Sequence, residues 1–187
     1  MKIAKYCLIG LLLATPLAQA KTAVAVFAGG CFWCIEQDYQ KLDGVIDVVS
    51  GFTGGKLKNP TYNGNHKGHY EAVKVTYDTD KLSYQDMLDK FWLSIDPFDN
   101  DGQFCDKGPS YRSAIFVKDN ERQLAQDSLQ AVQKQFPKEI VRTEILPMSE
   151  FWPVDAYHQD YAEKNPVRYK YYRWNCGRDQ RLDTIWG

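Results

Sequence analysis

The sequence predicts an α+β fold in one domain behind an N-terminal leader. Three observations carry this prediction: a length of 187 residues, an ordinary composition with 44% apolar and 25% charged residues, and short apolar runs that alternate with amphipathic segments. The formal net charge of −1 excludes the basic excess typical of nucleic-acid binding. Aromatic residues make up 14% of the chain, enough to line a small-molecule pocket as well as the core.

The first twenty residues have the pattern of a secretory signal peptide. Lys2 and Lys5 precede an apolar run over residues 6–13, and AQA at 18–20 offers a cleavage site. The run is too short to span a bilayer, so we expect no stable membrane insertion after processing. We expect a single domain at 21–187 in the periplasm, or in the cytoplasm if the signal is not used. A frayed N-terminal anchor is the alternative interpretation.

The secondary structure follows from hydrophobic periodicity. Apolar or alternating runs predict strands at 22–28, 45–52, 70–77, 111–117 and 140–146. Helical spacing predicts helices at 31–42, 83–95, 119–135 and 154–164, with Ser83 and Asp119 as N-caps of the second and third. After Pro166 the chain is aromatic and basic, with turn signals at Asn175 and Gly177, which predicts a coil tail.

The first six of these elements run β-α-β-β-α-β. This order is typical of the split βαβ, or ferredoxin-like, arrangement. It predicts a two-layer sandwich in which helices cover one face of a mixed sheet. Additional C-terminal helices, a strand and the coil tail would extend this ferredoxin-like βαββαβ core.

The most informative stretch is GGCFWC at residues 29–34, where the first strand meets the first helix. The two glycines allow a tight turn, and Cys31 falls at the helix N-terminus. Free backbone N–H groups and the helix dipole favour a thiolate there, so we expect the pKa of Cys31 to be lowered. A buried, inert cysteine is the alternative, but the double glycine and Cys34 three residues on favour a functional thiol.

Removal of the leader leaves four cysteines. They are Cys31, Cys34, Cys105 and Cys176, an even number that permits disulfides in an exported protein. Three roles compete: a dithiol that exchanges disulfides, a metal site, and a nucleophile that attacks a small substrate and becomes oxidised. A zinc site would need a second paired unit, whereas the other two cysteines and the histidines are scattered. We therefore expect no bound metal.

Further motifs follow GGCFWC along the chain: NPTY at 59–62, GHYE at 68–71, Asp106, and YRSA at 111–114, with HQDY at 158–161 and KNP at 164–166. In their order and spacing these motifs resemble those of peptide methionine sulfoxide reductase type A, with the weaker matches in HQDY and KNP. Two features depart from the better-known pattern of the family. The loop between Tyr62 and Glu71 lacks a cysteine seen in many relatives, and the cysteine expected soon after Asn-Pro comes later, at Cys176.

The resemblance implies an enzyme that reduces methionine-S-sulfoxide, free or in oxidised proteins, to methionine. Reduction of a sulfoxide needs a thiolate, a proton donor near the oxygen and an apolar cage for the methyl group. By resemblance Cys31 is the nucleophile and Glu71, on a strand among apolar neighbours that raise its pKa, is the general acid. The remaining roles implied are oxygen donors at Tyr62 and Tyr111, support of the same network by Asp106, and a methyl cage formed by Phe32 and Trp33.

Recycling of the oxidised enzyme leaves alternatives open. A sulfenic acid on Cys31 condenses with a nearby thiol, for which Cys34 is the first choice, Cys176 the rival and Cys105 the third. The resemblance implies no cofactor, an external reductant such as a thioredoxin-like protein or dithiothreitol, and no nucleic-acid partner. We further expect a monomer, and a structural or exposed place for His66, His69 and His158.

Two other functions compete with this interpretation. The first is a thioredoxin-like thiol–disulfide oxidoreductase that uses Cys31 and Cys34, although Trp33 lies inside the pair rather than before it. The second is a periplasmic binding module with an aromatic pocket, which leaves the paired cysteines unexplained. Turnover of methionine sulfoxide with dithiothreitol separates the three functions.

Overall fold

A computed structural model describes residues 21–187, so the predicted signal peptide at 1–20 lies outside the described residues. The central sheet has the strand order β7-β6-β1-β3-β2-β8, and every neighbouring pair is antiparallel except β6 and β7. Its strands are β1 (Thr22–Gly29), β2 (Val45–Thr53), β3 (Tyr70–Asp78), β6 (Ser113–Val117), β7 (Glu144–Pro147) and β8 (Trp152–Pro153). Two short strands, β4 (Gly102–Gln103) and β5 (Asp106–Lys107), form a separate hairpin.

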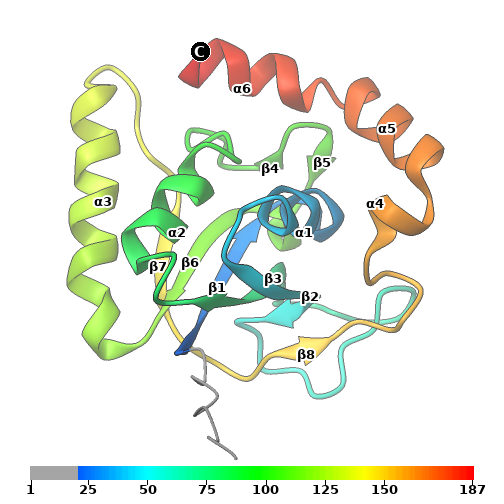
Figure 1. Ribbon diagram of the computed structural model, residues 1–187. Coiled ribbons are helices and arrows are strands. Elements are labelled where there is room, and N and C mark those ends of the chain that lie inside the picture. Colours follow the sequence, from blue (N-terminus) through cyan, green and yellow to red (C-terminus); the bar gives the residue numbers. More distant parts are fainter. Residues whose placement is uncertain (1–20) are drawn as a thin grey trace, which may run out of the picture.

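The helices lie mainly on one side of this sheet (Figure 1). They are α1 (Phe32–Gln40), α2 (Tyr84–Trp92), α3 (Arg122–Gln135), α4 (Tyr161–Lys164), α5 (Pro166–Asn175) and α6 (Arg178–Trp186), with 3-10 turns at Pro109–Tyr111 and Asp119–Glu121. The core elements β1-α1-β2-β3-α2-β6 stand in the spatial order β6-β1-β3-β2. The predicted α+β, ferredoxin-like βαββαβ core is therefore confirmed.

Alternation along the strands separates two apolar layers. On β3, Val73 and Val75 join Phe27 and Ile115 in the main core beneath the helices. The intervening positions of the sheet face the other way, into a smaller cluster that includes Val26, and Phe151 packs against that cluster. This period of two is the reason that strands 22–28, 45–52 and 70–77 could be placed to within one residue.

The N-cap of α2 is as predicted, but that of α3 is not. The Ser83 side chain accepts a hydrogen bond from the Asp86 backbone N–H, and the Asp86 side chain accepts one from the Ser83 backbone N–H, which completes a capping box. The prediction of Asp119 as a helix N-cap is wrong, because Asp119 begins a 3-10 turn and α3 starts at Arg122. A single 3-10 turn at a helix start satisfies the same backbone donors more tightly.

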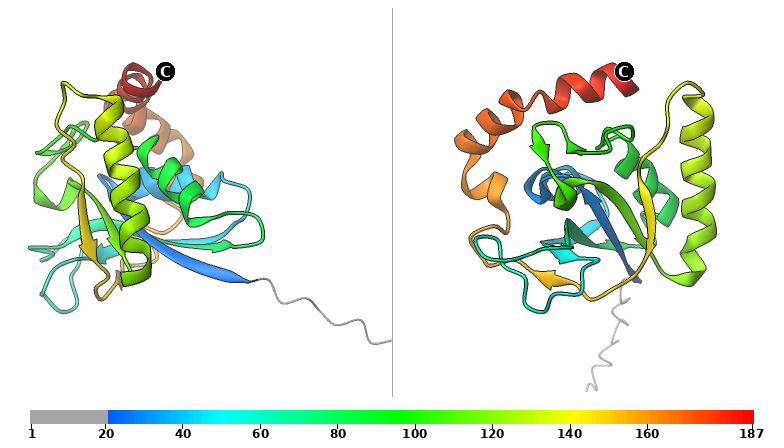
Figure 2. Two further views of the ribbon diagram at one scale, coloured as in Figure 1. Left: turned by 90° about the vertical axis from the view of Figure 1, so that its left-hand side faces the viewer. Right: turned by 180° about the vertical axis from the view of Figure 1, so that it is seen from behind.

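Four predictions for the C-terminal part need correction. The fourth strand begins at Ser113 instead of residue 111, the fifth spans Glu144–Pro147, and most of the helix expected at 154–164 is turns that lead into α4. The expected coil tail is two helices, α5 and α6, which break at the turn signal of Gly177 (φ 65°). Figure 2 shows α4, α5 and α6 following one another around the molecule.

Buried polar contacts hold the terminal helices against the core. Arg178 is 1% exposed and donates hydrogen bonds to the backbone oxygens of Gly29 (3.3 Å) and Ser94 (2.6 Å). The Nη1 atom of Arg173 lies 3.0 Å from Oδ1 of Asp38 in α1, and the two side chains form an ion pair. These long-range partners order a segment that has little apolar periodicity of its own. Within residues 21–187, no helix combines the length and apolar character that crossing a membrane requires.

Candidate active site

Cys31 stands where β1 turns sharply into α1. Gly30 has a φ of 84°, and a Cβ at this position would lie 2.6 Å from the Cβ of Gln103, so only glycine fits the turn. Cys31 is the N-cap residue of α1, as its place in the sequence predicts, and its backbone oxygen accepts from the Cys34 N–H at 3.1 Å. Cys31 is 5% exposed, so it is almost entirely shielded from solvent.

Cys31 and Cys34 are the free cysteines among the described residues, and both are buried. Burial, together with a hydrogen bond to Cys34, raises the pKa of the Cys31 thiol. The hydrogen bond from Cys31 lowers the pKa of Cys34 to about 7, helped by the positive charges of Arg178 and Arg173. The expected lowering at Cys31 is therefore wrong for the resting pair, because desolvation exceeds the effect of the helix terminus. The titrations of the two buried thiols are therefore linked, and Cys34 is the one that loses its proton more readily near neutral pH.

Glu71 places a protonated carboxyl next to this pair. It comes from β3, is 1% exposed, and its Oε2 accepts the backbone N–H of Phe32 at 3.2 Å. Its Oε1 has no hydrogen-bond partner among the described residues. Burial raises the pKa of Glu71 to about 8, and the negative charge of Asp106 adds to this, against the hydrogen bond from Phe32. The carboxyl predicted to be an acid is thus neutral at pH 7 and carries a free polar atom.

Two tyrosines lie close enough to Glu71 for its charge to act on their hydroxyl groups. Burial raises the pKa of Tyr62 to about 12, and the negative charges of Glu71, Cys31 and Asp106 contribute in that order. Burial also raises the pKa of Tyr111, again followed by the charge of Glu71. Both phenols therefore keep their protons at neutral pH and can donate hydrogen bonds. The structure brings together the sulfur, the acid and both donors that the sequence singled out.

Stacked aromatic rings form one wall of the site. Phe32 and Trp33 lie 6.2 Å apart between ring centroids, and Tyr62 packs on both. Two residues not predicted for the site complete this wall: Tyr161 stacks on Trp33 at 3.8 Å, and buried His158 lies 4.0 Å from Tyr62. A cavity of about 280 Å³ opens beside them, lined by Trp33, Tyr62, Asn63, Asp155, Tyr157, His158, Tyr161 and Arg168.

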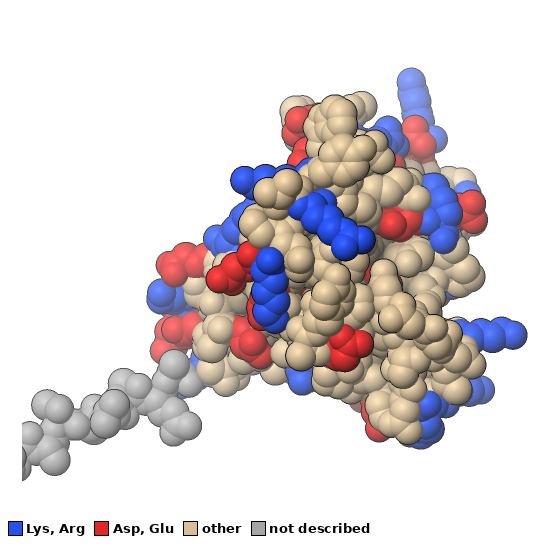
Figure 3. Space-filling model, turned by 90° about the vertical axis from the view of Figure 1, so that its right-hand side faces the viewer, with Lys and Arg blue, Asp and Glu red and all other residues tan. Residues whose placement is uncertain are grey.

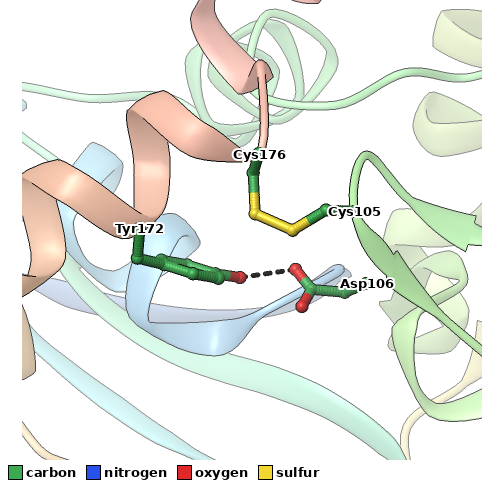
Figure 4. Close-up of a disulfide and its surroundings, with 4 residues drawn as sticks. All are labelled: Cys105, Asp106, Tyr172 and Cys176. Carbon is green, nitrogen blue, oxygen red and sulfur yellow. Dashed lines mark hydrogen bonds between the residues drawn. A yellow bond between two sulfur atoms is a disulfide. The ribbon is translucent and has the colours of Figure 1, made fainter.

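The other two cysteines are joined to each other. Cys105 and Cys176 form a disulfide across 71 residues of sequence, with Cα atoms 4.9 Å apart. Beside it, the hydroxyl of Tyr172 donates a hydrogen bond of 2.5 Å to Asp106 (Figure 4). Sequence reasoning placed Asp106 in the site but missed Tyr172, since nothing in the chain marks which tail residue returns to β5. Cys176 is not a free thiol in this structure.

Among residues 21–187, one group of side chains lies close enough together to bind a metal ion. The ligand atoms of Cys105, Asp106 and Cys176 lie within 4.8 Å of one another. Both sulfurs are bonded to each other, which leaves a single carboxylate as donor. A structural zinc site takes four ligands, with deprotonated cysteine sulfurs, so this oxidised group does not fit one.

The face that carries the C-terminal helices has a mixed charge distribution. Figure 3 shows acidic and basic side chains interspersed there, with uncharged surface between them. Such a face does not present the single-sign field that steers strongly charged ligands. The chemistry at the site is therefore set by local groups, namely a dithiol, a neutral carboxyl and phenolic donors next to aromatic rings.

Comparison with known proteins adds relatives in sequence and in structure. The sequence model of the family described as peptide methionine sulfoxide reductase matches residues 23–187. A Caulobacter vibrioides protein, peptide methionine sulfoxide reductase MsrA 2, is 50% identical over 93% of this chain and 90% of its own. Methionine sulfoxide reductase A of Corynebacterium diphtheriae has a similar structure, with a TM-score of 0.72 and 32% identity over 80% of this chain and 77% of its own.

A more distant structure has the same fold. It is Mxr1 from Saccharomyces cerevisiae in complex with Trx2, with a TM-score of 0.55 and 23% identity over 76% of this chain and 86% of that one.

Proposed function

This chain belongs to the peptide methionine sulfoxide reductase family, type A, and reduces methionine sulfoxide, and on this premise we propose how its own residues perform the reaction. The Cys31 thiol passes its proton to the neighbouring Cys34 sulfur, and the resulting Cys31 thiolate attacks the sulfoxide sulfur while Glu71 gives its proton to the sulfoxide oxygen. The oxygen passes to Cys31, which becomes a sulfenic acid, and the substrate leaves as methionine. The two electrons gained by the substrate are those lost by Cys31.

The observation that carries this proposal is the place of Glu71. Its carboxyl is buried, neutral at pH 7, and bonded to the backbone N–H of Phe32, the residue directly after the nucleophile. This hydrogen bond fixes the proton donor to the first turn of the helix that carries Cys31. The donor and the Cys31 sulfur therefore keep a constant position relative to each other. Tyr62 and Tyr111 donate hydrogen bonds to the same oxygen, and the rings of Phe32 and Trp33 receive the methyl group.

We assign the recycling step to Cys34. Its thiol condenses with the sulfenic acid of Cys31, which forms the Cys31–Cys34 disulfide and releases water. Two observations support this assignment: Cys34 is a free thiol buried in the same cluster as Cys31, and Cys176 is engaged with Cys105. A thioredoxin-type protein would then reduce the disulfide, as the complex of yeast Mxr1 with Trx2 suggests for this chain by analogy. No prosthetic group is required by this sequence of steps.

The location of the enzyme is also a proposal. The charge, apolar run and AQA site at the N-terminus support export to the periplasm and cleavage after residue 20. Oxidised proteins and free methionine sulfoxide in that compartment are the substrates we expect, for a monomeric enzyme. Edman sequencing of the protein recovered from the periplasm would begin at Lys21.

The function is tested with residues 21–187, dithiothreitol and the two separated sulfur epimers of methionine sulfoxide. We expect the S epimer to be consumed and the R epimer to remain, because the methyl cage and the oxygen donors fix two substituents of the sulfur. Consumption of both epimers at similar rates would contradict this pocket. Reduction of insulin disulfides without any sulfoxide turnover would instead support the thioredoxin-like alternative.

A further inference from the structure

The Cys105–Cys176 disulfide ties together two segments that each deliver a side chain to the site. Cys105 immediately precedes Asp106, and Cys176 is the C-cap residue of α5, one helical turn after Tyr172. Residues four apart on a helix point to the same side, so the bond and Tyr172 face β5 together. Figure 4 shows the result, with the hydrogen bond from Tyr172 to Asp106 running beside the disulfide.

This pair of contacts lies against the reacting groups. The Tyr172 ring packs edge-on to Trp33, with 6.1 Å between ring centroids, and joins the cluster that contains both free cysteines. The disulfide itself is accessible, since Cys105 is exposed and Cys176 half-buried, whereas Cys31 and Cys34 are buried. An accessible covalent bond therefore lies directly beside a hydrogen bond of the site.

The hydrogen bond fixes the charge of Asp106. Burial raises the pKa of Asp106, and three neighbours oppose this: first the hydroxyl of Tyr172, then the positive charges of Arg178 and Lys107. The hydroxyl is the largest of these opposing effects. Without it, the buried carboxylate would either take up a proton or turn toward water.

The charge of Asp106 in turn acts on Glu71. Burial is the main cause of the raised pKa of Glu71, and the Asp106 charge is the largest electrostatic contribution in the same direction. The hydrogen bond from the Phe32 N–H and the nearby hydroxyl of Tyr111 act against it, and Cys34 adds a smaller raising effect. The titratable and charged groups that face Glu71 or Asp106 are Cys31, Cys34, Tyr62, Tyr111, Tyr172, Arg178 and Lys107.

We infer that Tyr172 and the Cys105–Cys176 disulfide form one positioning unit that holds the Asp106 carboxylate against the proton donor Glu71. This inference rests on the acid role proposed for Glu71. Tyr172 acts through Asp106 and is a positioning residue. Reduction of the exposed disulfide releases α5 from β5, and the enzyme then loses proton-donating capacity at alkaline pH while it keeps its thiols.

The test is the pH profile of a single turnover measured without added reductant, because dithiothreitol would open the disulfide. The protein is used as isolated, after mass mapping has verified two free thiols and an intact Cys105–Cys176 bond. Tyr172→Phe removes the hydroxyl and leaves the ring, and the double variant Cys105→Ser with Cys176→Ser removes the bond. Tyr171→Phe, at an adjacent side chain that is 65% exposed, is the matched control.

We expect the alkaline limb of the rate profile to move to lower pH by about one unit in both variants, as loss of a nearby charge predicts. Rates at pH 6 should stay within about threefold of wild type, because Glu71 is protonated there in every variant. Combining the substitutions should add little further shift, and Tyr171→Phe should leave the profile in place. An unmoved limb, an equal loss at every pH, or a faster reaction in Tyr172→Phe would overturn the inference.

A second measurement keeps this inference separate from the proposed function. The titration of Glu71 is followed by carbon NMR of side-chain-labelled protein, with Glu71→Gln to assign its signal. We expect the midpoint to fall in Tyr172→Phe and in the disulfide variant, whether or not sulfoxide is turned over. A midpoint that stays in place in folded variants overturns the positioning role, whereas absent turnover in wild type overturns the proposed function alone.

Discussion

Glu71 is buried, and the hydrogen bond that it accepts from the Phe32 backbone N–H is compatible with a neutral carboxyl group. Replacement by glutamine keeps the shape and the acceptor for the Phe32 N–H but removes the proton. We expect Glu71→Gln to lower kcat/KM by about 10²–10⁴-fold at pH 7, the range typical of general acid catalysis. Steady-state assays with the S epimer measure this loss. The deficit should narrow toward low pH, where solvent protonates the oxygen, and a wild-type rate at pH 8 would contradict the role.

The same carboxyl sets the pH dependence of the wild-type enzyme. A general acid works in its protonated form, and the pKa of Glu71 is raised to about 8. The contribution of this acid should therefore be lost, and the rate should fall, as the pH rises through about 8. A single-turnover rate profile from pH 6 to pH 10, measured without reductant so that the Cys105–Cys176 bond stays intact, shows this limb. The residual activity of Glu71→Gln should not show this fall at alkaline pH. If the fall remained in the variant, another group would be its cause.

Glu71 should also cost stability. Its pKa in the folded protein is about 8 against an ordinary value of 4.5, so the unfolded chain loses a proton that the folded protein retains. The folded state is thus increasingly disfavoured as the pH rises from 4.5 to about 8. We expect Glu71→Gln to raise the free energy of unfolding at pH 7 by on the order of 2–3 kcal/mol. Urea titrations should show a gain that vanishes at pH 4, and a constant gain would refute this origin.

The individual residues of the site could be predicted to different degrees. Cys31, Glu71 and both tyrosines lie in contiguous motifs whose order the sequence displays, and the structure brings them together. The places of His158, Tyr161 and Tyr172 were missed, because each depends on a chain segment that returns to the site from more than one hundred residues away. The Cys105–Cys176 pairing was missed because the proximity of two thiols 71 residues apart is a property of the fold.

Among the elements, α2 shows best how local sequence determines a boundary. Ser83 and Asp86 exchange side-chain and backbone hydrogen bonds at its start. Ser83→Ala removes the side-chain acceptor of one backbone N–H group in the first turn of α2. We expect a loss of about 1 kcal/mol in unfolding free energy. Activity should be unchanged, because α2 contributes no residue to the site. Thermal and urea unfolding measure the loss. If Ser83→Ala also lowered the activity, α2 would have to position the site, contrary to this expectation.

The terminal helices show where local sequence is insufficient. Strands with a period of two and helices with a continuous apolar face were placed correctly, because the spacing of their apolar residues shows which side is buried. In α5 only Tyr169 is buried, while Tyr171 and Trp174 are exposed, so no apolar stripe marks the helix. Its order comes from ion pairs, the disulfide and contacts with the core, which a single sequence does not reveal.

For the whole molecule, Arg178 couples the terminal helices to the sheet. Its guanidinium bonds the ends of two core segments at Gly29 and Ser94 and lies 4.4 Å over the ring of Phe104. Arg178→Ala leaves two buried oxygens without a donor, and we expect a loss of about 2–4 kcal/mol in unfolding free energy. Limited proteolysis should then cleave after residue 165 more rapidly. Arg168→Ala, on the exposed side of α5, is the control, and equal protection in both variants would contradict this coupling.

The central claim is that Cys31 attacks the sulfoxide and Cys34 resolves the sulfenic acid. One equivalent of the S epimer is added without reductant, and the protein is alkylated, digested with trypsin and mapped by mass spectrometry. We predict one methionine per enzyme and a peptide 22–41 that has lost two hydrogens and resists alkylation. Cys31→Ser should form no methionine, and Cys34→Ala should form one equivalent and leave a dimedone-reactive Cys31. A peptide that links Cys31 to Cys176, or methionine formed by Cys31→Ser, would contradict the account.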